Sequence, residues 1–122
     1  MNFFFCIAYF RAAQKLRLQE FRDFACQIAG YTSSYNESEP YSNLIRGALQ
    51  SAAMTIGGCD EIEILPINLT REGYRWAGNT FHLLNYESHI NQTLDPSFGS
   101  EIVERLTDSI LEKVYAEPNQ KK

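Results

Sequence analysis

The sequence predicts a mainly α-helical fold, with about four helices and at most a small edge β-sheet. Apolar residues recur at spacings of three and four in several segments, which is the period of an amphipathic helix. Glycine and proline stand at the borders of these segments, where helices usually begin and end. One stretch, residues 61–69, alternates apolar and polar residues instead, so an α+β arrangement is the alternative.

The first helix is predicted over residues 12–29. Its apolar positions at helical spacing are Leu18, Phe21, Ala25 and Ile28. Gly30 is a natural end for this helix, since glycine tolerates the left-handed conformation that closes many helices. Residues 3–10 are apolar almost throughout, which suits either a buried strand or the first two turns of a longer helix.

The second helix is predicted to begin near Pro40, because proline fits the first helical turn, where its missing N–H would be unpaired anyway. Ser38 or Glu39 would then occupy the cap position, and Gly57 and Gly58 would end the helix. The stripe expected to be buried consists of Ile45, Ala48, Leu49, Ala52 and Ile56.

Residues 61–69 follow as a candidate strand. Pro66 interrupts the alternation, so this strand would lie at a sheet edge or carry a bulge. Thr70 is a candidate cap for a third helix, in which apolar residues recur about every three and a half positions over residues 74–86. A hairpin that turns at Gly78 and Asn79 is the alternative for this segment.

The last helix is predicted to begin after Ser100, with Glu101 and Glu104 near its N-terminus, where the helix dipole favours negative charge. Its inner stripe would consist of Val103, Leu106, Ile110 and Val114. A chain of 122 residues has the usual size of one domain. We therefore expect a single globular domain over residues 1–117 and a frayed polar tail over residues 118–122.

Composition and charge restrict the class of protein. Hydrophobic residues make up 44% of the chain and charged residues 21%, which is typical of a folded globular protein. The net charge of −4 is unlike that of a dedicated nucleic-acid binder. Cys6, Cys26 and Cys59 are odd in number and widely spaced, which indicates reduced thiols and a cytoplasmic protein. No stretch has the roughly 20 apolar residues of a membrane span.

No motif predicts a catalytic, metal or cofactor site. His82 and His89 are seven residues apart, which is too far for the usual pair of metal ligands on one helix. Cys59 follows two glycines, but the neighbouring Asp60, Glu61 and Glu63 would raise the pKa of its thiol and oppose formation of a nucleophile. We therefore expect no catalytic residues, no bound metal and no cofactor.

A basic stripe in the first helix supports a different function. Arg11, Lys15 and Arg22 would line one side of the helix, where they are placed to contact a phosphate backbone. In an acidic protein such a stripe is more often a solvated helix face. It keeps a small nucleic-acid-binding regulator open as an alternative function.

The middle of the chain combines aromatic and acidic residues. Residues 30–41 read GYTSSYNESEPY, and tyrosine mixed with serine and asparagine is the composition of adaptable binding loops. Acidic residues there and in residues 60–63 favour a cationic partner through electrostatic steering. The predicted partner-binding residues are Tyr31, Tyr35, Glu37, Glu39, Tyr41, Asp60, Glu61 and Glu63.

In size, charge and lack of motif, the chain is similar to the small acidic immunity proteins with which bacteria neutralise their own toxins. That group includes immunity proteins of contact-dependent growth inhibition and of nuclease bacteriocins. The resemblance implies a cytoplasmic inhibitor, not an enzyme, that binds a cationic protein toxin of the nuclease kind and occludes its active or substrate-binding surface. It implies no direct contact with nucleic acid or membrane. A small enzyme, or an enzyme subunit with a dispersed site, is the other alternative.

Overall fold

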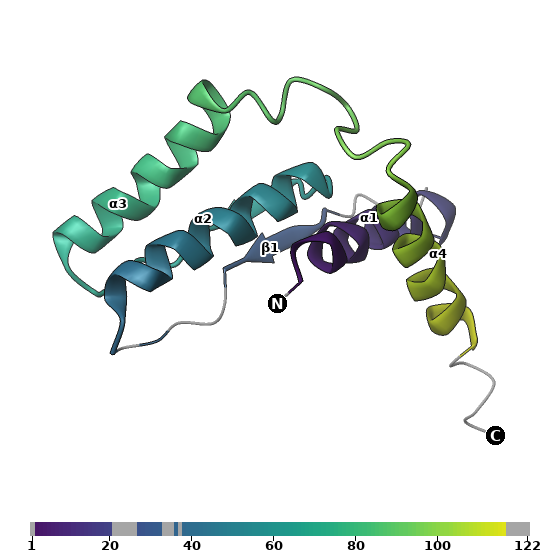
Figure 1. Ribbon diagram of the computed structural model, residues 1–122, viewed down its shortest axis with the longest axis horizontal. Helices are drawn as coiled ribbons and strands as arrows, with labels where there is room; N and C mark the ends of the chain where they lie inside the picture. Colours follow the sequence, from purple (N-terminus) through teal and green to yellow (C-terminus); the bar gives the residue numbers. More distant parts are fainter. Residues whose placement is uncertain (1, 21–26, 33–35, 37, 117–122) are drawn as a thin grey trace.

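The computed structural model describes residues 2–20, 27–32, 36 and 38–116 (Figure 1). It confirms a mainly α-helical fold with a small sheet. In chain order the elements are α1 (Phe3–Glu20), β1 (Ala29–Tyr31), α2 (Pro40–Ile56), β2 (Glu61–Glu63), α3 (Arg71–His82), the π-helical turn η1 (Leu83–Glu87) and α4 (Glu101–Ala116).

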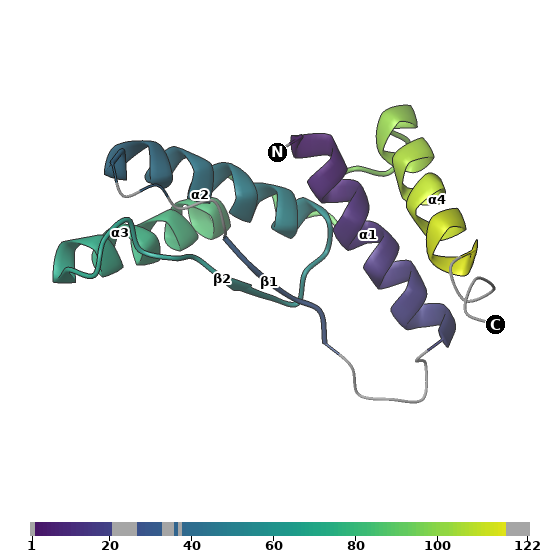
Figure 2. The same cartoon turned by 90° about the horizontal axis from the view of Figure 1, so that it is seen from below.

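The two strands are parallel, and α2 connects them in a β–α–β unit. Ala29 pairs with Glu61, and Tyr31 pairs with Glu63. Neighbouring helices pack in the order α4, α1, α2, α3, and Figure 2 shows the sheet on one side of this helical row. In the part of the chain that the structure describes, four helices accompany two strands, whereas parallel sheets are usually larger and covered on both faces.

Helix α1 includes residues 3–10, so the strand alternative for that segment is wrong. The predicted extension of the helix to Ala29 is also wrong, because Ala29 begins strand β1. Residues 21–26 lie outside the described part. Gly30 is not a helix end but the central residue of β1. A Cβ atom at this position would lie 2.3 Å from Met54 Sδ, so glycine lets the strand approach α2 closely.

Helix α2 begins at Pro40 and ends before Gly57 and Gly58, as predicted, and Gly58 has a left-handed φ of 85°. Its predicted buried stripe is wrong at Ile45 and Leu49, which are 65% and 56% exposed, whereas Ile56 packs against the core. The buried residues are Asn43, Gly47, Gln50, Ser51, Ala53 and Met54. Small residues fit this face because other elements approach it closely. Its buried Ser51 hydroxyl has a hydrogen-bond partner within the helix, since it donates to the Gly47 carbonyl at 2.7 Å.

The segment after β2 folds as helix α3, so the hairpin alternative at residues 78–79 is wrong. Thr70 caps the helix as predicted, because its side chain accepts a hydrogen bond from the Gly73 backbone N–H at 3.2 Å. The strand itself is short, covering Glu61–Glu63, and it is an edge strand of the two-stranded sheet. The chain then passes through η1 and an irregular segment to α4 (Figure 1).

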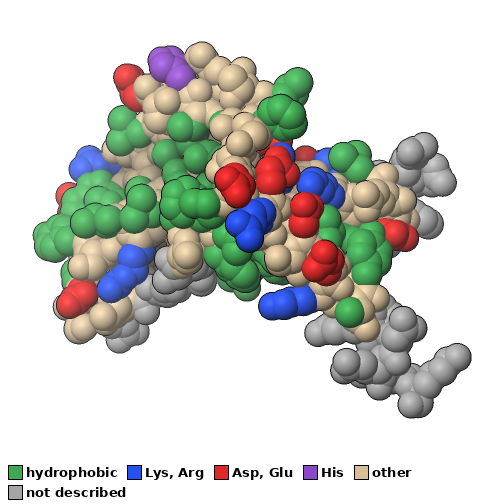
Figure 3. All heavy atoms as spheres, turned by 45° about the vertical axis from the view of Figure 1, so that its right-hand side comes forward, with side chains coloured by type: hydrophobic (Ala, Val, Ile, Leu, Met, Phe, Trp, Pro, Cys, Tyr) green, Lys and Arg blue, Asp and Glu red, His purple; other side chains and the backbone are tan. Residues whose placement is uncertain are grey.

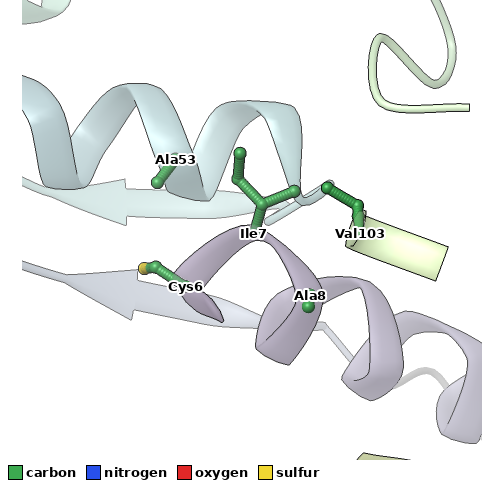
Figure 4. Packing of buried hydrophobic residues seen from close by; sticks show 5 residues of the cluster. All are labelled: Cys6, Ile7, Ala8, Ala53 and Val103. Carbon is green, nitrogen blue, oxygen red and sulfur yellow. The ribbon is translucent and has the colours of Figure 1, made fainter. Parts of the chain in front are cut away.

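The core lies where α1, α2 and α4 meet. Figure 4 shows Ile7 of α1 between Ala53 of α2 and Val103 of α4. Leu106 and Ile110 pack against this cluster as predicted, but Val114 is exposed near the end of α4. Among the helices described, none combines the length and the apolar character needed to cross a membrane.

Candidate functional site

Three predicted partner-binding residues lie together on the sheet. Tyr31 pairs with Glu63, and Glu61 lies two residues before Glu63 on the same strand, so the three side chains share one face. All three are exposed. The opposite face carries Gly30 and Ile62, which point toward α2. The face with Tyr31, Glu61 and Glu63 is therefore the face that α2 does not cover.

The other predicted residues are separated from this face. Asp60 forms an ion pair with Arg17 at 2.7 Å and accepts a hydrogen bond from the Ile28 backbone N–H at 2.8 Å. These contacts make Asp60 part of the connection between α1, β1 and β2. Glu39 lies 3.6 Å from Arg46 at the start of α2.

Tyr41, also at the start of α2, has its ring centroid 6.1 Å from that of Trp76 on α3. Tyr35 and Glu37 lie outside the described residues. The structure thus brings three of the eight predicted residues together, while the others it describes contact neighbouring helices or loops.

The basic stripe is engaged within the protein. Arg11 is only 9% exposed, and its Nη2 lies 2.7 Å from both Asp95 and Glu104. Lys15 lies 3.7 Å from Glu104 and 3.6 Å from Asp108. Figure 3 shows basic and acidic side chains alternating on the side that holds α1 and α4. Arg11 and Lys15 therefore join α1 to α4 and do not form an open phosphate-binding stripe, and Arg22 lies outside the described residues.

A hollow of about 470 Å³ lies between α2, β2 and the segment from the end of α3 to Leu94. Sequence reasoning missed it, because Phe81, Asn85 and Asn91 line it from segments that carry no motif. Asn91 donates a side-chain hydrogen bond to Asn85 at 2.9 Å. The hollow therefore combines amide groups with apolar walls, an arrangement that suits binding through hydrogen bonds and apolar contact.

Cys59 also lines this hollow, and its thiol stays protonated near neutral pH. Burial, followed by the proximity of Cys6 and Asp60, raises the pKa of Cys59 to about 12. The sequence predicted the direction of this shift from the neighbouring acids, but burial is the larger cause. At this position the thiol is a poor nucleophile.

The two histidines have separate environments. The His82 ring stacks on Tyr86 with centroids 5.8 Å apart, and His89 lies 2.8 Å from the Gln92 side chain. In the described ranges, no group of three or more His, Cys, Asp or Glu side chains is placed to hold a metal ion.

Similarity to known proteins extends over nearly the whole chain. The family model described as methylmalonyl-CoA mutase matches residues 1–120. A methylmalonyl-CoA mutase of Rhizobium meliloti is 31% identical, over 94% of this chain and 18% of that protein. A methylmalonyl-CoA mutase small subunit of Porphyromonas gingivalis is 32% identical, over 93% of this chain and 21% of that protein. A methylmalonyl-CoA mutase of Escherichia coli is 32% identical, over 95% and 18%. The chain spans about a fifth of the length of these relatives.

These matches correct the function expected from the sequence. The resemblance to immunity proteins is wrong, and so are the predicted toxin partner and the expectation that the protein is not an enzyme. Size, acidity and lack of motifs are shared by inhibitors and by enzyme segments whose sites are dispersed, so these properties cannot separate the two classes. The alternative of an enzyme or enzyme subunit agrees with the matches. With a family model that matches residues 1–120, the chain belongs to the methylmalonyl-CoA mutase family.

Proposed function

We propose that the polypeptide carrying these 122 residues is a methylmalonyl-CoA mutase or one of its subunits. The observation that carries the proposal is the family match over residues 1–120. The names of the relatives specify methylmalonyl-CoA as what they act on, and the word mutase denotes the transfer of a group within one molecule. One relative is named a small subunit, which supports a second mutase subunit as the partner.

Within such an enzyme, we propose that residues 1–122 are a structural part that is completed by other mutase segments. The sheet has only two parallel strands in the described residues, and Tyr31, Glu61 and Glu63 lie on the face that α2 leaves open. The outer side of α2 exposes Tyr41, Ile45 and Leu49, which recur at every fourth residue along the helix. Open faces of parallel sheets and exposed apolar helix faces of this kind are usually covered in a complete protein.

We also propose that this enzyme works in the cytoplasm. The supporting observation is that Cys6 and Cys59 are free thiols, since reducing compartments keep cysteines in this state.

Deletion of the encoding gene in its host tests the proposed activity. Extracts of the deletion strain should lose conversion of methylmalonyl-CoA to its isomer, measured by chromatography of the CoA thioesters. Resupply of the polypeptide should restore it. Resupply with the Gly78→Ala variant should restore it equally, because outside the adjoining backbone of α3 no atom lies within 4 Å of the added Cβ. A full conversion rate in the deletion extract would contradict the proposal.

A further inference from the structure

Two sulfur atoms from different parts of the chain lie against Gly30 of β1. A Cβ atom built on Gly30 would lie 2.3 Å from Met54 Sδ of α2 and 3.2 Å from Cys59 Sγ, in the turn before β2. Both sulfur atoms are therefore close to one point beside the strand, and so they are close to each other. Glycine leaves free the space that these two side chains share.

A third sulfur atom belongs to Cys6 of α1. Cys6 and Met54 line the same apolar groove, of about 200 Å³, together with Tyr31 of β1. Figure 4 shows the Cys6 side chain pointing from α1 toward the strands. Burial raises the pKa of Cys59, and the proximity of Cys6 raises it further, so the two thiols lie close enough to interact electrostatically. We call Cys6, Met54 and Cys59 the sulfur cluster.

The local fold holds the sulfur cluster in place. Cys6 is 7% exposed and Met54 is 1% exposed. Gly58 turns the chain after α2 with its left-handed φ of 85°, and the Cys59 backbone N–H donates to the Met54 carbonyl at 3.0 Å. The turn thus returns Cys59 to the side of Met54. Sequence analysis predicted no metal site, because these residues have no motif spacing and meet only after folding.

We propose that the sulfur cluster binds one copper ion as Cu(I), through the thiolates of Cys6 and Cys59 and the thioether of Met54. Thiolate and thioether sulfur are soft ligands, which select Cu(I). A structural zinc site would need four ligands, and in the described ranges no histidine or carboxylate completes a set of three with the two thiols. Asp60, which follows Cys59, is already paired with Arg17.

The ion can reach the sulfur cluster from the surface. Cys59 lines the hollow of about 470 Å³ between α2, β2 and the segment after α3, and it is only partly buried. Each thiol releases its proton when it binds the ion, so two protons leave and the site gains one net negative charge. Water in the hollow can solvate this charge at Cys59, which lowers the cost of forming it inside the protein.

Titration with Cu(I) in competition with bicinchoninate tests the two thiols. The complete polypeptide, kept reduced and free of oxygen, should take Cu(I) from the coloured bicinchoninate complex. Cys59→Ser should bind one Cu(I) per chain fewer, whereas Cys26→Ser should bind as much as the wild type, because the proposed site does not use Cys26. Circular dichroism verifies that both variants fold. An unchanged amount for Cys59→Ser, or an equal loss for Cys26→Ser, would overturn the site.

A second substitution tests the thioether. Met54→Leu keeps the volume of the side chain and removes its sulfur. It should weaken Cu(I) binding at least about tenfold, a loss that even the outer contacts of metal sites produce. Leu106→Ile is the matched control, because it also exchanges an apolar side chain that packs against the core, but on α4. Unchanged affinity for Met54→Leu, or equal weakening by Leu106→Ile, would contradict the role given to Met54.

X-ray absorption at the copper edge tests the site without any substitution. In the wild-type polypeptide loaded with one Cu(I), every neighbour of the ion should be sulfur. Nitrogen or oxygen neighbours would overturn the proposed ligands. These measurements require no mutase activity, so the copper site and the proposed function are tested separately.

Discussion

Arg11 is the only charged residue that is buried among those described, and it holds α4 against α1. Its guanidinium lies between Asp95 and Glu104, whose side chains are only partly exposed. Arg11→Ala would leave these two carboxylates close together without their cation. We expect the free energy of unfolding to fall by about 2–4 kcal/mol, as for other broken ion pairs of low exposure.

Urea denaturation followed by circular dichroism measures this change. Arg105→Ala is the matched control, because Arg105 and its partner Glu101 are both about four-fifths exposed, and such a pair contributes less than about 1 kcal/mol. A loss for Arg11→Ala no larger than that for Arg105→Ala would show that the buried ion pairs do not stabilise the packing of α4.

Glu104 makes the same contact dependent on pH. The hydrogen bond from Arg11, together with the nearby charges of Arg11 and Lys15, holds the pKa of Glu104 below its ordinary value in the folded chain. This contribution to stability is therefore complete above the pKa of an unfolded glutamate, about 4.3, and is lost as the pH falls through the lower folded pKa. The urea midpoint should decrease in that acid range.

The Glu104→Gln variant should show a smaller decrease of the urea midpoint over the same acid range, because its side chain cannot titrate. Glu101→Gln serves as the control for the loss of one acid on an exposed part of α4. If the urea midpoint decreased equally with falling pH in the wild type and in Glu104→Gln, the role given to this carboxylate would be contradicted.

At the level of elements, Gly57 sets the distance between α1 and α2. A Cβ atom at this position would lie 2.8 Å from the Phe10 Cβ and 3.0 Å from the Ile7 carbonyl oxygen. Neither atom is the end of a flexible side chain, so Gly57→Ala must separate the two helices. We expect a loss of about 1–3 kcal/mol in the free energy of unfolding, which is typical of overpacking.

Gly78 provides the opposite case within α3. Outside the adjoining backbone of α3, no atom lies within 4 Å of a Cβ built there, so Gly78→Ala should raise the free energy of unfolding by about 0.5–1 kcal/mol through helix propensity. Thermal unfolding of both variants checks the pair of predictions. Stabilisation by both alanines would mean that α1 and α2 do not approach each other at Gly57.

The sequence predicted elements better than it predicted burial. Pro40, Thr70 and the Gly57–Gly58 pair act locally, so helix borders near them were predicted correctly. The stripe with Ile45 and Leu49 was assigned to the core because periodicity reports which helix face is apolar. It does not report whether that face is covered within residues 1–122. Ala29 was assigned to a helix and Gly30 to its end because nothing local indicates the contact of β1 with α2.

The site was predicted only in part, for a similar reason. Tyr31, Glu61 and Glu63 were selected by residue type, and the parallel pairing of β1 and β2 places them on one face. That they bind a partner stays a prediction. Asp60 was selected by the same criterion, but its contacts with Arg17 and the Ile28 N–H depend on the fold and left no signal in the sequence. The hollow lined by Asn85 and Asn91 also forms only after folding.

At the scale of the whole molecule, exposed apolar side chains surround a small core. They include Phe5 and Tyr9 beside β1 and Ile45 and Leu49 on α2. In Figure 3 hydrophobic side chains gather in the half of the view that holds α2 and α3. We still propose one domain over residues 1–117, built on the cluster around Ile7 and joined to further mutase segments through these faces.

Size-exclusion chromatography of the tagged polypeptide from its host, with methylmalonyl-CoA conversion assayed in every fraction, tests membership of a working mutase most directly. The polypeptide should elute in a particle several times heavier than the 14.0 kDa of residues 1–122, with the activity in the same peak. Elution at the mass of residues 1–122 alone, or a heavier peak without methylmalonyl-CoA conversion, would contradict the account.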